Sequence, residues 1–296
     1  MRNQFKKTLL DIAEIDQMSC VLIGDISHHL LKEYEEKYPN RFYNLGICEQ
    51  TLIGLASGMS MNGFRPVVHT IAPFCVERAF EQIKIDLCYQ KTEVSIISVG
   101  SSFDYAHLGC THHCYEDVAI LRSLPEIQVF VPGNSQEFDY LLKKTWGNGK
   151  PKYFKLSNKE HKYNLQVDPF KHKIVQKGFG DKIIFVTGHL LDEVMDAVKE
   201  DATVVYLSSL NNLEYNTKEE IANMVSSGQT YIVEENSKIG GLGDLIFDIS
   251  SEFNKSIKAK KIAIPNIFLT NYGKPEEHRE KIGLTVDGIK KEIYDL

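Results

Sequence analysis

The stretch Tyr43-Asn44-Leu45-Gly46-Ile47-Cys48-Glu49-Gln50 contains a short extended segment that ends at a glycine, followed by the expected start of a helix. Residues 51–61 have the spacing of an amphipathic helix that is rich in small side chains. Glu49 therefore lies near the positive end of the helix dipole, although most of its neighbours in the sequence are apolar. Such a carboxylate is either an ordinary first-turn acid, which is the more common case, or a buried acid that handles a proton.

Outward from this stretch, strand-like and helix-like segments alternate along the chain. Strands are expected at residues 20–25, 67–71, 94–99, 127–131 and 153–155. Helices are expected at residues 4–15, 29–37, 76–90, 116–123 and 135–145. This alternation is typical of a doubly wound α/β domain with a parallel sheet.

A second α/β domain is expected after a polar, basic segment that contains Pro169 and has no clear period. The alternation then restarts, with strands expected at 183–186, 204–207 and 230–234 and helices at 190–199, 217–226 and from about 243. We therefore predict two doubly wound domains with mainly parallel sheets, residues 1–160 and 176–296, joined by a linker at 161–175.

The composition is that of an ordinary globular protein. The 296 residues carry a formal net charge of −6, with 34 Lys and Arg mixed among 40 Asp and Glu, so no electrostatic footprint for nucleic acid is visible. No apolar stretch is long enough to span a bilayer, and the first residues lack the apolar core of a signal peptide. We expect a cytoplasmic protein that binds neither nucleic acid nor a membrane.

Two local motifs offer alternatives to a catalytic acid. The run Cys110-Thr111-His112-His113-Cys114 contains soft metal ligands, but no second ligand pair exists elsewhere in the sequence, and we expect no metal site on this chain. The run Ile239-Gly240-Gly241-Leu242-Gly243-Asp244 follows a strand but lacks the spacing of a dinucleotide fingerprint. A tight turn between strand and helix is the simpler interpretation of these glycines.

The order of several motifs resembles the transketolase family, especially the members that are split into two subunits. The matching runs are Asn44–Gln50, Val68–Phe74, Arg78–Ile83, Gly109–His113 with Glu116-Asp117, Leu124-Pro125 before Val129–Pro132, and Val233–Ser237 with Ile239–Gly243. Any one of these runs is a weak match, but the ordered set covers nearly the whole chain. The resemblance implies a pyrimidine-binding domain followed by a transketolase C-terminal domain.

The resemblance also implies a cofactor and roles for individual residues. Family members bind thiamine diphosphate between two domains, and this chain corresponds to the domain that holds the aminopyrimidine. Glu49 matches the glutamate that hydrogen-bonds to the pyrimidine ring and activates it, which requires a carboxyl group in a dry interface. Phe74 matches the aromatic residue that stacks on the pyrimidine, and Ile26, beside Asp25, matches the residue that supports the bent cofactor. His112 matches a histidine that lines the substrate channel.

The diphosphate-binding motif of the family, Gly-Asp-Gly followed by a distant Asn, is missing from this sequence. The nearest string, Gly24-Asp25-Ile26-Ser27, belongs to the pyrimidine-binding part of the match. We therefore expect an N-terminal partner subunit that carries the diphosphate-binding domain and holds Mg²⁺ or Ca²⁺, in a two-plus-two heterotetramer.

Three expected sugar ligands are replaced. Leu108 stands where an aspartate is expected, Gly100 where a histidine is expected, and Asn158 where an arginine is expected. Losing an arginine removes a bidentate grip on phosphate. We therefore predict a transferase that moves a two-carbon ketol unit, or a related acyl anion, to an atypical acceptor such as a modified or nucleotide-linked sugar.

Three alternatives remain open. The chain could be the beta subunit of a 2-oxoacid dehydrogenase or a relative of 1-deoxyxylulose-5-phosphate synthase, although Gly109–His113 follows the transketolase pattern. It could be a non-catalytic regulatory relative, which the lost sugar ligands favour and the retained Glu49 and Phe74 disfavour. It could also be an α/β protein in which Glu49 is purely structural.

Overall fold

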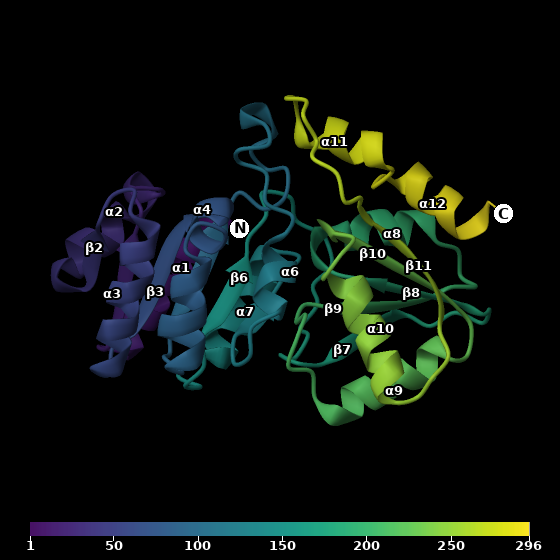
Figure 1. Ribbon diagram of the computed structural model, residues 1–296, viewed down its shortest axis with the longest axis horizontal. Helices are drawn as coiled ribbons and strands as arrows, with labels where there is room; N and C mark the ends of the chain where they lie inside the picture. The colour runs from purple at the N-terminus through teal and green to yellow at the C-terminus, as the bar shows by residue number, and fades with distance from the viewer. Residues whose placement is uncertain (296) are drawn as a thin grey trace.

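The computed structural model describes residues 1–295, which form two sheets, each covered by helices on both faces (Figure 1). The first sheet has six parallel strands in the order β2-β1-β3-β4-β6-β5. Its strands are β1 (Ser19–Ile23), β2 (Phe42–Asn44), β3 (Arg65–Ile71), β4 (Ser95–Val99), β5 (Gln128–Phe130) and β6 (Lys152–Lys155). The predicted doubly wound α/β class is confirmed for this part of the chain.

Successive side chains of β1 point into two different cores, one on each face of the first sheet. Val21 and Ile23 face a cluster formed with α1, α2 and α7, whereas Cys20 and Leu22 face a cluster formed with α3, α4, η2 and α6. Because both faces are covered, β1 is buried at every position rather than at alternate positions. The helices are α1 (Arg2–Ile15), α2 (His28–Lys37), α3 (Glu49–Met61), α4 (Ala72–Val76), α5 (Phe80–Gln82), the π-helix η2 (Ile83–Tyr89), α6 (Asp117–Arg122) and α7 (Ser135–Thr145).

The strand order creates a switch point beside β1. The chain passes from β1 to β2 on one side and then crosses to β3 on the other, with Ile23 in register with both Asn44 and His69. In open parallel sheets, ligands bind outside the carboxyl ends of the strands at such a point. The segments that follow β1, β2 and β3 are therefore expected to form a site.

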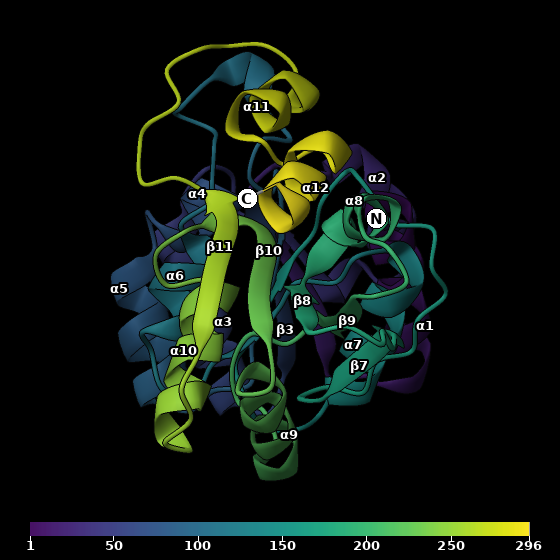
Figure 2. The same ribbon diagram turned by 90° about the vertical axis from the view of Figure 1, so that its right-hand side faces the viewer.

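The second sheet has five strands in the order β11-β10-β8-β9-β7, of which only the edge strand β7 is antiparallel to its neighbour. Its strands are β7 (His172–Gln176), β8 (Lys182–Val186), β9 (Thr203–Leu207), β10 (Gln229–Ser237) and β11 (Lys258–Ile264). Helices α8 (Leu191–Ala197) and α12 (Val286–Tyr294) cover one face, and α9 (Tyr215–Val225) and α10 (Leu242–Glu252) cover the other. The mainly parallel second sheet is confirmed as well (Figure 2).

The structure differs from the sequence-based expectations mainly at sheet edges and in one helix. β2 lies in the extended segment expected before Gly46, whereas the edge strands β7 and β11 differ from the prediction, and β7 begins at His172, inside the segment expected to be a linker. Edge strands are exposed along one side and carry polar residues, so β7 and β11 lack a strong apolar pattern. The helix expected at 76–90 is divided into α4, α5 and η2. Helices α11 (Pro275–Ile282) and α12 were also missed.

A buried joint connects the two sheets. Glu137 at the start of α7 accepts hydrogen bonds from the Gly133 amide (2.5 Å) and from the Tyr206 hydroxyl of β9 (2.7 Å). The ring of His161 packs at the same place, and a Cβ atom at Gly133 would overlap with it. Only glycine therefore fits at position 133. Burial raises the pKa of Glu137 to about 7, even though these hydrogen bonds oppose the shift.

No helix within residues 1–295 combines the length and the apolar character that a membrane span requires.

We predict that the joint makes stability depend on pH. Because the pKa of Glu137 rises from 4.5 to about 7 on folding, the protonated carboxyl stabilises the folded state below pH 4.5, and this stabilisation is lost as pH rises through about 7. Relative to Glu137→Gln, the wild-type free energy of unfolding should fall by on the order of 3 kcal/mol across that range. Denaturant unfolding of both proteins at a series of pH values measures the difference. Parallel plots of unfolding free energy against pH for the two proteins would contradict this prediction. Glu219→Gln, on the exposed face of α9, is the matched control.

Candidate active site

Glu49 is the first residue of α3 and is 2% exposed. It lies at the N-terminus of α3, after β2, where the helix dipole has its positive end. Arg78 donates a hydrogen bond from Nη1 to Oε2 of Glu49 at 2.8 Å, and within residues 1–295 it is the one group that does so. The other carboxylate oxygen, Oε1, makes no hydrogen bond to the described protein. Glu49 is therefore a buried acid held at one oxygen, as expected for a group that binds a ligand through the other.

The site extends from Glu49 through contacts with Arg78, then Phe74, and then His112. The guanidinium of Arg78 lies 4.3 Å from the centre of the Phe74 ring, and the ring of His112 meets Phe74 edge-on at 5.3 Å. Phe74 lies in α4, directly after β3, while His112 lies in the loop after β4. The structure thus brings three of the predicted residues, Glu49, Phe74 and His112, into one continuous set of contacts.

His112 is half-buried, and its Nδ1 lies 2.9 Å from the hydroxyl of Thr111. Burial lowers the pKa of His112, and the neighbouring His107 lowers it further. The imidazole is therefore neutral at pH 7 and can either donate or accept a hydrogen bond.

Asp25 and Ile26 lie in a strained turn at the carboxyl end of β1. Asp25 and Ser27 both have positive φ, at 66° and 65°. The side chain of Asn44, at the end of β2, accepts a hydrogen bond from the Asp25 amide (3.1 Å) and donates one to the Asp25 carboxylate (3.3 Å). Asp25 is exposed and Ile26 is half-buried. These two residues therefore lie at the switch point, on the strand beside those that lead to Glu49 and Phe74.

A polar relay behind this turn was not predicted from the sequence. Nδ1 of buried His69 lies 2.7 Å from the carbonyl of Ile97, so this nitrogen must carry the proton, and Nε2 accepts from the Ser27 hydroxyl at 2.9 Å. Ser27 in turn accepts from Nη2 of Arg2 at 2.9 Å, and Nε of Arg2 is buried without a partner among the described residues. Burial lowers the pKa of His69 to about 4, so the ring stays neutral. Arg2 is thus a cation close to the switch point.

Arg78 is the second residue whose role was missed. It belongs to a run that matches the family, and it follows Phe74 by four residues, a spacing that places side chains on one helix face. That spacing could have suggested its contact with Phe74. Its ion pair with Glu49 could not be predicted, because it depends on how α3 packs against α4.

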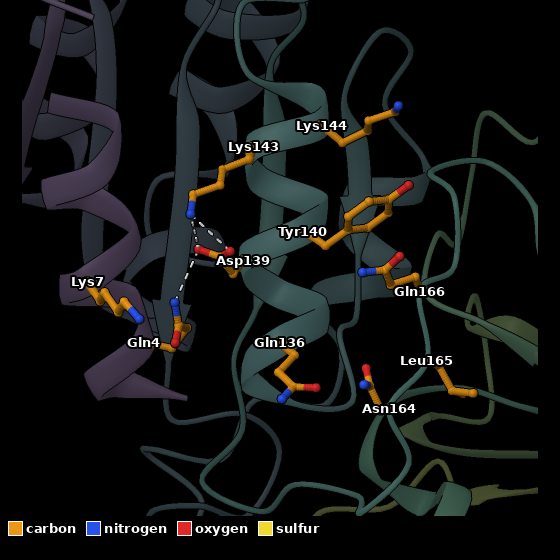
Figure 3. Close-up of a pocket in the computed structure, with 10 residues that line it drawn as sticks. All are labelled: Gln4, Lys7, Gln136, Asp139, Tyr140, Lys143, Lys144, Asn164, Leu165 and Gln166. Carbon is orange, nitrogen blue, oxygen red and sulfur yellow. Dashed lines mark hydrogen bonds and ion pairs between the residues drawn. The ribbon is translucent and has the colours of Figure 1, made fainter. Parts of the chain in front are cut away.

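The hollow drawn in Figure 3 lies elsewhere. This groove of about 680 Å³ is formed by α1, α7 and residues 164–166, on the opposite face of the first sheet from α3. Its Lys143 pairs with Asp139 (2.9 Å) and with Asp11 (2.8 Å), so the charge is already neutralised. None of the predicted site residues lines the groove.

In the part of the chain that the structure describes, no three His, Cys, Asp or Glu side chains come together in a way that could hold a metal ion. Cys110 is exposed and Cys114 is buried, and both are free thiols.

Comparison with known proteins identifies the family. Residues 1–162 match the model described as transketolase, pyrimidine binding domain. The "uncharacterized 33.6 kDa protein in fasciation locus" of Rhodococcoides fascians is 34% identical over 212 residues, which are 71% of this chain and 67% of that protein. One subunit of the apulose-4-phosphate transketolase of Actinobacillus succinogenes is 29% identical over 280 residues, 91% of this chain and 89% of the relative.

A solved structure gives the same result in three dimensions. The protein described as "split gene transketolase, inactive beta4 tetramer" superimposes with a TM-score of 0.87 at 28% identity, covering 99% of this chain and 96% of that one. The family model, the relatives and this structure agree on the family and on the fold. The chain therefore belongs to the transketolase family and corresponds to the C-terminal, pyrimidine-binding subunit of a split transketolase.

Proposed function

We propose that this chain is one subunit of a heteromeric, thiamine diphosphate-dependent transferase that moves a two-carbon ketol or acyl-anion unit, with Glu49 activating the aminopyrimidine of the cofactor. The observation that supports this most directly is the buried Glu49 carboxylate, which is held at Oε2 by Arg78, the same residue whose guanidinium lies over the ring of Phe74. A structural carboxylate in a core is usually satisfied at both oxygens. Glu49 is instead arranged to accept or share one further proton.

The residues present fit an aminopyrimidine. Phe74 is half-buried and offers an aromatic face, while Glu49 offers a carboxylate oxygen at a helix N-terminus. The guanidinium of Arg78 covers one face of Phe74. A pyrimidine that stacks on Phe74 must therefore use the other face or displace Arg78.

The chain contributes proton handling and positioning rather than the covalent chemistry. Bound thiamine diphosphate would supply the acyl-anion chemistry of the reaction. Glu49 would share a proton with the pyrimidine ring through Oε1, while Arg78 keeps the carboxylate oriented through Oε2. In an interface without water, this hydrogen bond is much stronger than in solution. His112, neutral at pH 7, would exchange hydrogen bonds with the hydroxyl or carbonyl groups of a sugar.

An apolar surface next to Glu49 fits a partner subunit that carries the diphosphate-binding domain. Ile47, in the segment before α3, and Tyr89, at the end of η2, are 75% and 78% exposed. Leu55 of α3 and Ile85 of η2 are also exposed. Ile47 lies two residues before Glu49, and η2 packs beside the later half of α3, where the Ser57 hydroxyl donates a hydrogen bond to the Asp86 carbonyl. A second chain that covers these residues would complete the dry environment that Glu49 needs. The relative named as one subunit of a transketolase and the structure named as an inactive beta4 tetramer support the proposal.

The substrate side supports an atypical sugar acceptor. Gly100 has a positive φ of 80°, and a Cβ atom there would lie 2.5 Å from the ring of Tyr105. Tyr105 thus occupies the space that a side chain at position 100 would need. Leu108 is exposed. The backbone amide of Asn158 donates a hydrogen bond to the carboxylate of Asp104 at 3.0 Å. The relative from Actinobacillus succinogenes is named for apulose 4-phosphate.

The role of Glu49 is tested by Glu49→Gln in the complex with the partner subunit. The amide cannot share a proton with the ring, so kcat/KM should fall by about 10²–10⁴-fold while the melting temperature stays close to that of the wild type. Glu219→Gln, an exposed change on α9, should have no effect. Full activity of Glu49→Gln would exclude the proposed proton transfer.

The need for a partner is tested by measuring cofactor binding. The isolated chain should not bind thiamine diphosphate with Mg²⁺ in calorimetry, whereas an equimolar mixture with the subunit that carries the diphosphate motif should bind it and elute as a larger assembly in size exclusion. Tight binding by the isolated chain would overturn this prediction. A Tyr89→Lys change on the apolar surface should weaken assembly, because it places a charge in the interface.

The acceptor is tested by kinetics of the assembled complex with a series of keto donors and sugar acceptors. We expect modified or nucleotide-linked sugars to be used with higher kcat/KM than ribose 5-phosphate when xylulose 5-phosphate is the donor. Efficient turnover of that standard pair would contradict the atypical acceptor and leave the role of Glu49 unaffected.

A further inference from the structure

The loop that carries His112 belongs structurally to the second sheet as much as to the first. Phe103, Ala106 and Tyr115 are buried, and they pack in the core cluster formed by β8, β9, β10 and helices α8 and α12. The 3-10 turn η3 (Ala106–Leu108) lies beside α11 in both views (Figures 1 and 2). The side chains on either side of His112 are thus held by the C-terminal part of the chain.

Hydrogen bonds reinforce these contacts at both ends of the loop. Ser102 donates from its hydroxyl to the carbonyl of Glu235 at 2.6 Å, and the Ser237 amide donates to the carbonyl of Tyr115 at 2.7 Å. The Tyr115 hydroxyl donates to the carbonyl of Ile267 at 3.0 Å. Residues 102 and 115 are therefore fixed to β10 and to the segment after β11.

Helix α11 places one residue directly against this loop. His278 is fully buried, its ring stacks on Phe103 at 5.1 Å, and it meets the edge of the His113 ring at 4.9 Å. Both ring nitrogens of His278 and of His113 are without hydrogen-bond partners among residues 1–295. The two rings therefore fix each other by packing. His113 is the residue that follows His112 in the sequence.

An ion pair fixes α11 in turn. Arg279, which follows His278, pairs through Nε and Nη2 with the buried carboxylate of Glu235 on β10. His189 lies 3.3 Å from the same carboxylate. His189 and Arg279 beside it hold the pKa of Glu235 well below its usual range, despite burial. The position of His278 is thus set by β10, which also binds Ser102.

Few contacts within the loop order His112. Cys110 and Thr111 are exposed, and Gly109 has a positive φ of 75°. The His112 amide donates to the Gly109 carbonyl at 2.9 Å, and its ring meets Thr111, the edge of Phe74 and, at 6.4 Å between ring centres, Tyr105. A Cβ atom at Gly109 would lie 2.7 Å from Tyr272, so the segment after β11 lies directly over the loop here as well. An exposed glycine-containing segment has few interactions of its own to fix a side chain. The anchors at its two ends must supply that order.

We infer that the C-terminal domain acts as the scaffold of the substrate channel, and that His278 is a positioning residue for His112. The inference rests on the proposed function for its catalytic part, since it assigns to His112 a role toward the acceptor. The ordering of the loop stands independently of that function. Because no ring nitrogen of His278 is hydrogen-bonded within residues 1–295, the role depends on an aromatic ring at position 278 and not on its proton.

Three variants of the full-length chain test the inference. His278→Ala removes the ring between Phe103 and His113, whereas His278→Phe keeps an aromatic ring of similar shape. His172→Ala is the matched control, because it removes an imidazole from β7, which pairs with β9 away from the loop. Hydrogen exchange of the amides of residues 105–113 is measured on the chain itself, and kinetics are measured on the assembled complex.

We expect His278→Ala to speed exchange in residues 105–113 while exchange in β4 stays unchanged. In the complex, kcat/KM for the acceptor should fall by about 10-fold to 10²-fold through a higher KM, with cofactor affinity unchanged. His278→Phe should restore both values, and His172→Ala should change neither. A general loss of stability in His278→Ala would instead also speed exchange in β4 and weaken cofactor binding.

Other outcomes overturn the inference at distinct points. Unchanged exchange in the loop of His278→Ala, or no rescue by His278→Phe, would exclude the scaffold. Faster exchange with an unchanged acceptor KM would exclude the positioning of His112. If the wild-type complex shows no thiamine-dependent activity, the proposed function fails, and hydrogen exchange alone still decides whether the C-terminal domain orders the loop.

Discussion

The carboxylate of Glu49 is the group on which the arrangement of the site depends. Removing a carboxylate from water is unfavourable unless charges or hydrogen bonds compensate for the lost solvation. Here the N-terminus of α3 and the guanidinium of Arg78 provide that compensation, and Arg78 is itself held over the ring of Phe74. This requires α3 to begin shortly after β2, and α4 to begin directly after β3. Because β1 separates those two strands, the site can form only at the switch point of the sheet.

The second constraint is that the two sheets are not independent. One apolar cluster contains side chains of α3 and η2 together with side chains of β8, β9 and α10, and Glu137 connects α7 to β9. The loop between β4 and α6 is divided in the same way, with His112 facing Phe74 while Phe103 and Tyr115 pack on the C-terminal side. A side chain of the site is therefore oriented from both halves of the chain.

The fold was predictable wherever a segment is buried on both faces. Strands β1, β3, β4, β8 and β9 are short apolar runs between helical segments, and each was expected within a few residues of its observed bounds. Edge strands are different. β7 and β11 are largely polar and are ordered by pairing with β9 and β10, so no local pattern distinguishes them from a loop. α11 was missed for a related reason, since its buried residues are His278 and Arg279 rather than apolar side chains.

The sequence by itself determined the α/β class and the family, and it predicted Glu49, Phe74 and His112 as site residues, because these depend on local patterns and on the order of short motifs. Tertiary structure alone decided that Arg78 pairs with Glu49, that Tyr105 occupies the space at Gly100, and that α11 packs against the loop of His112. Each of these contacts joins elements that are separate along the chain. Their geometry follows from how helices and sheets pack together, which no stretch of sequence contains.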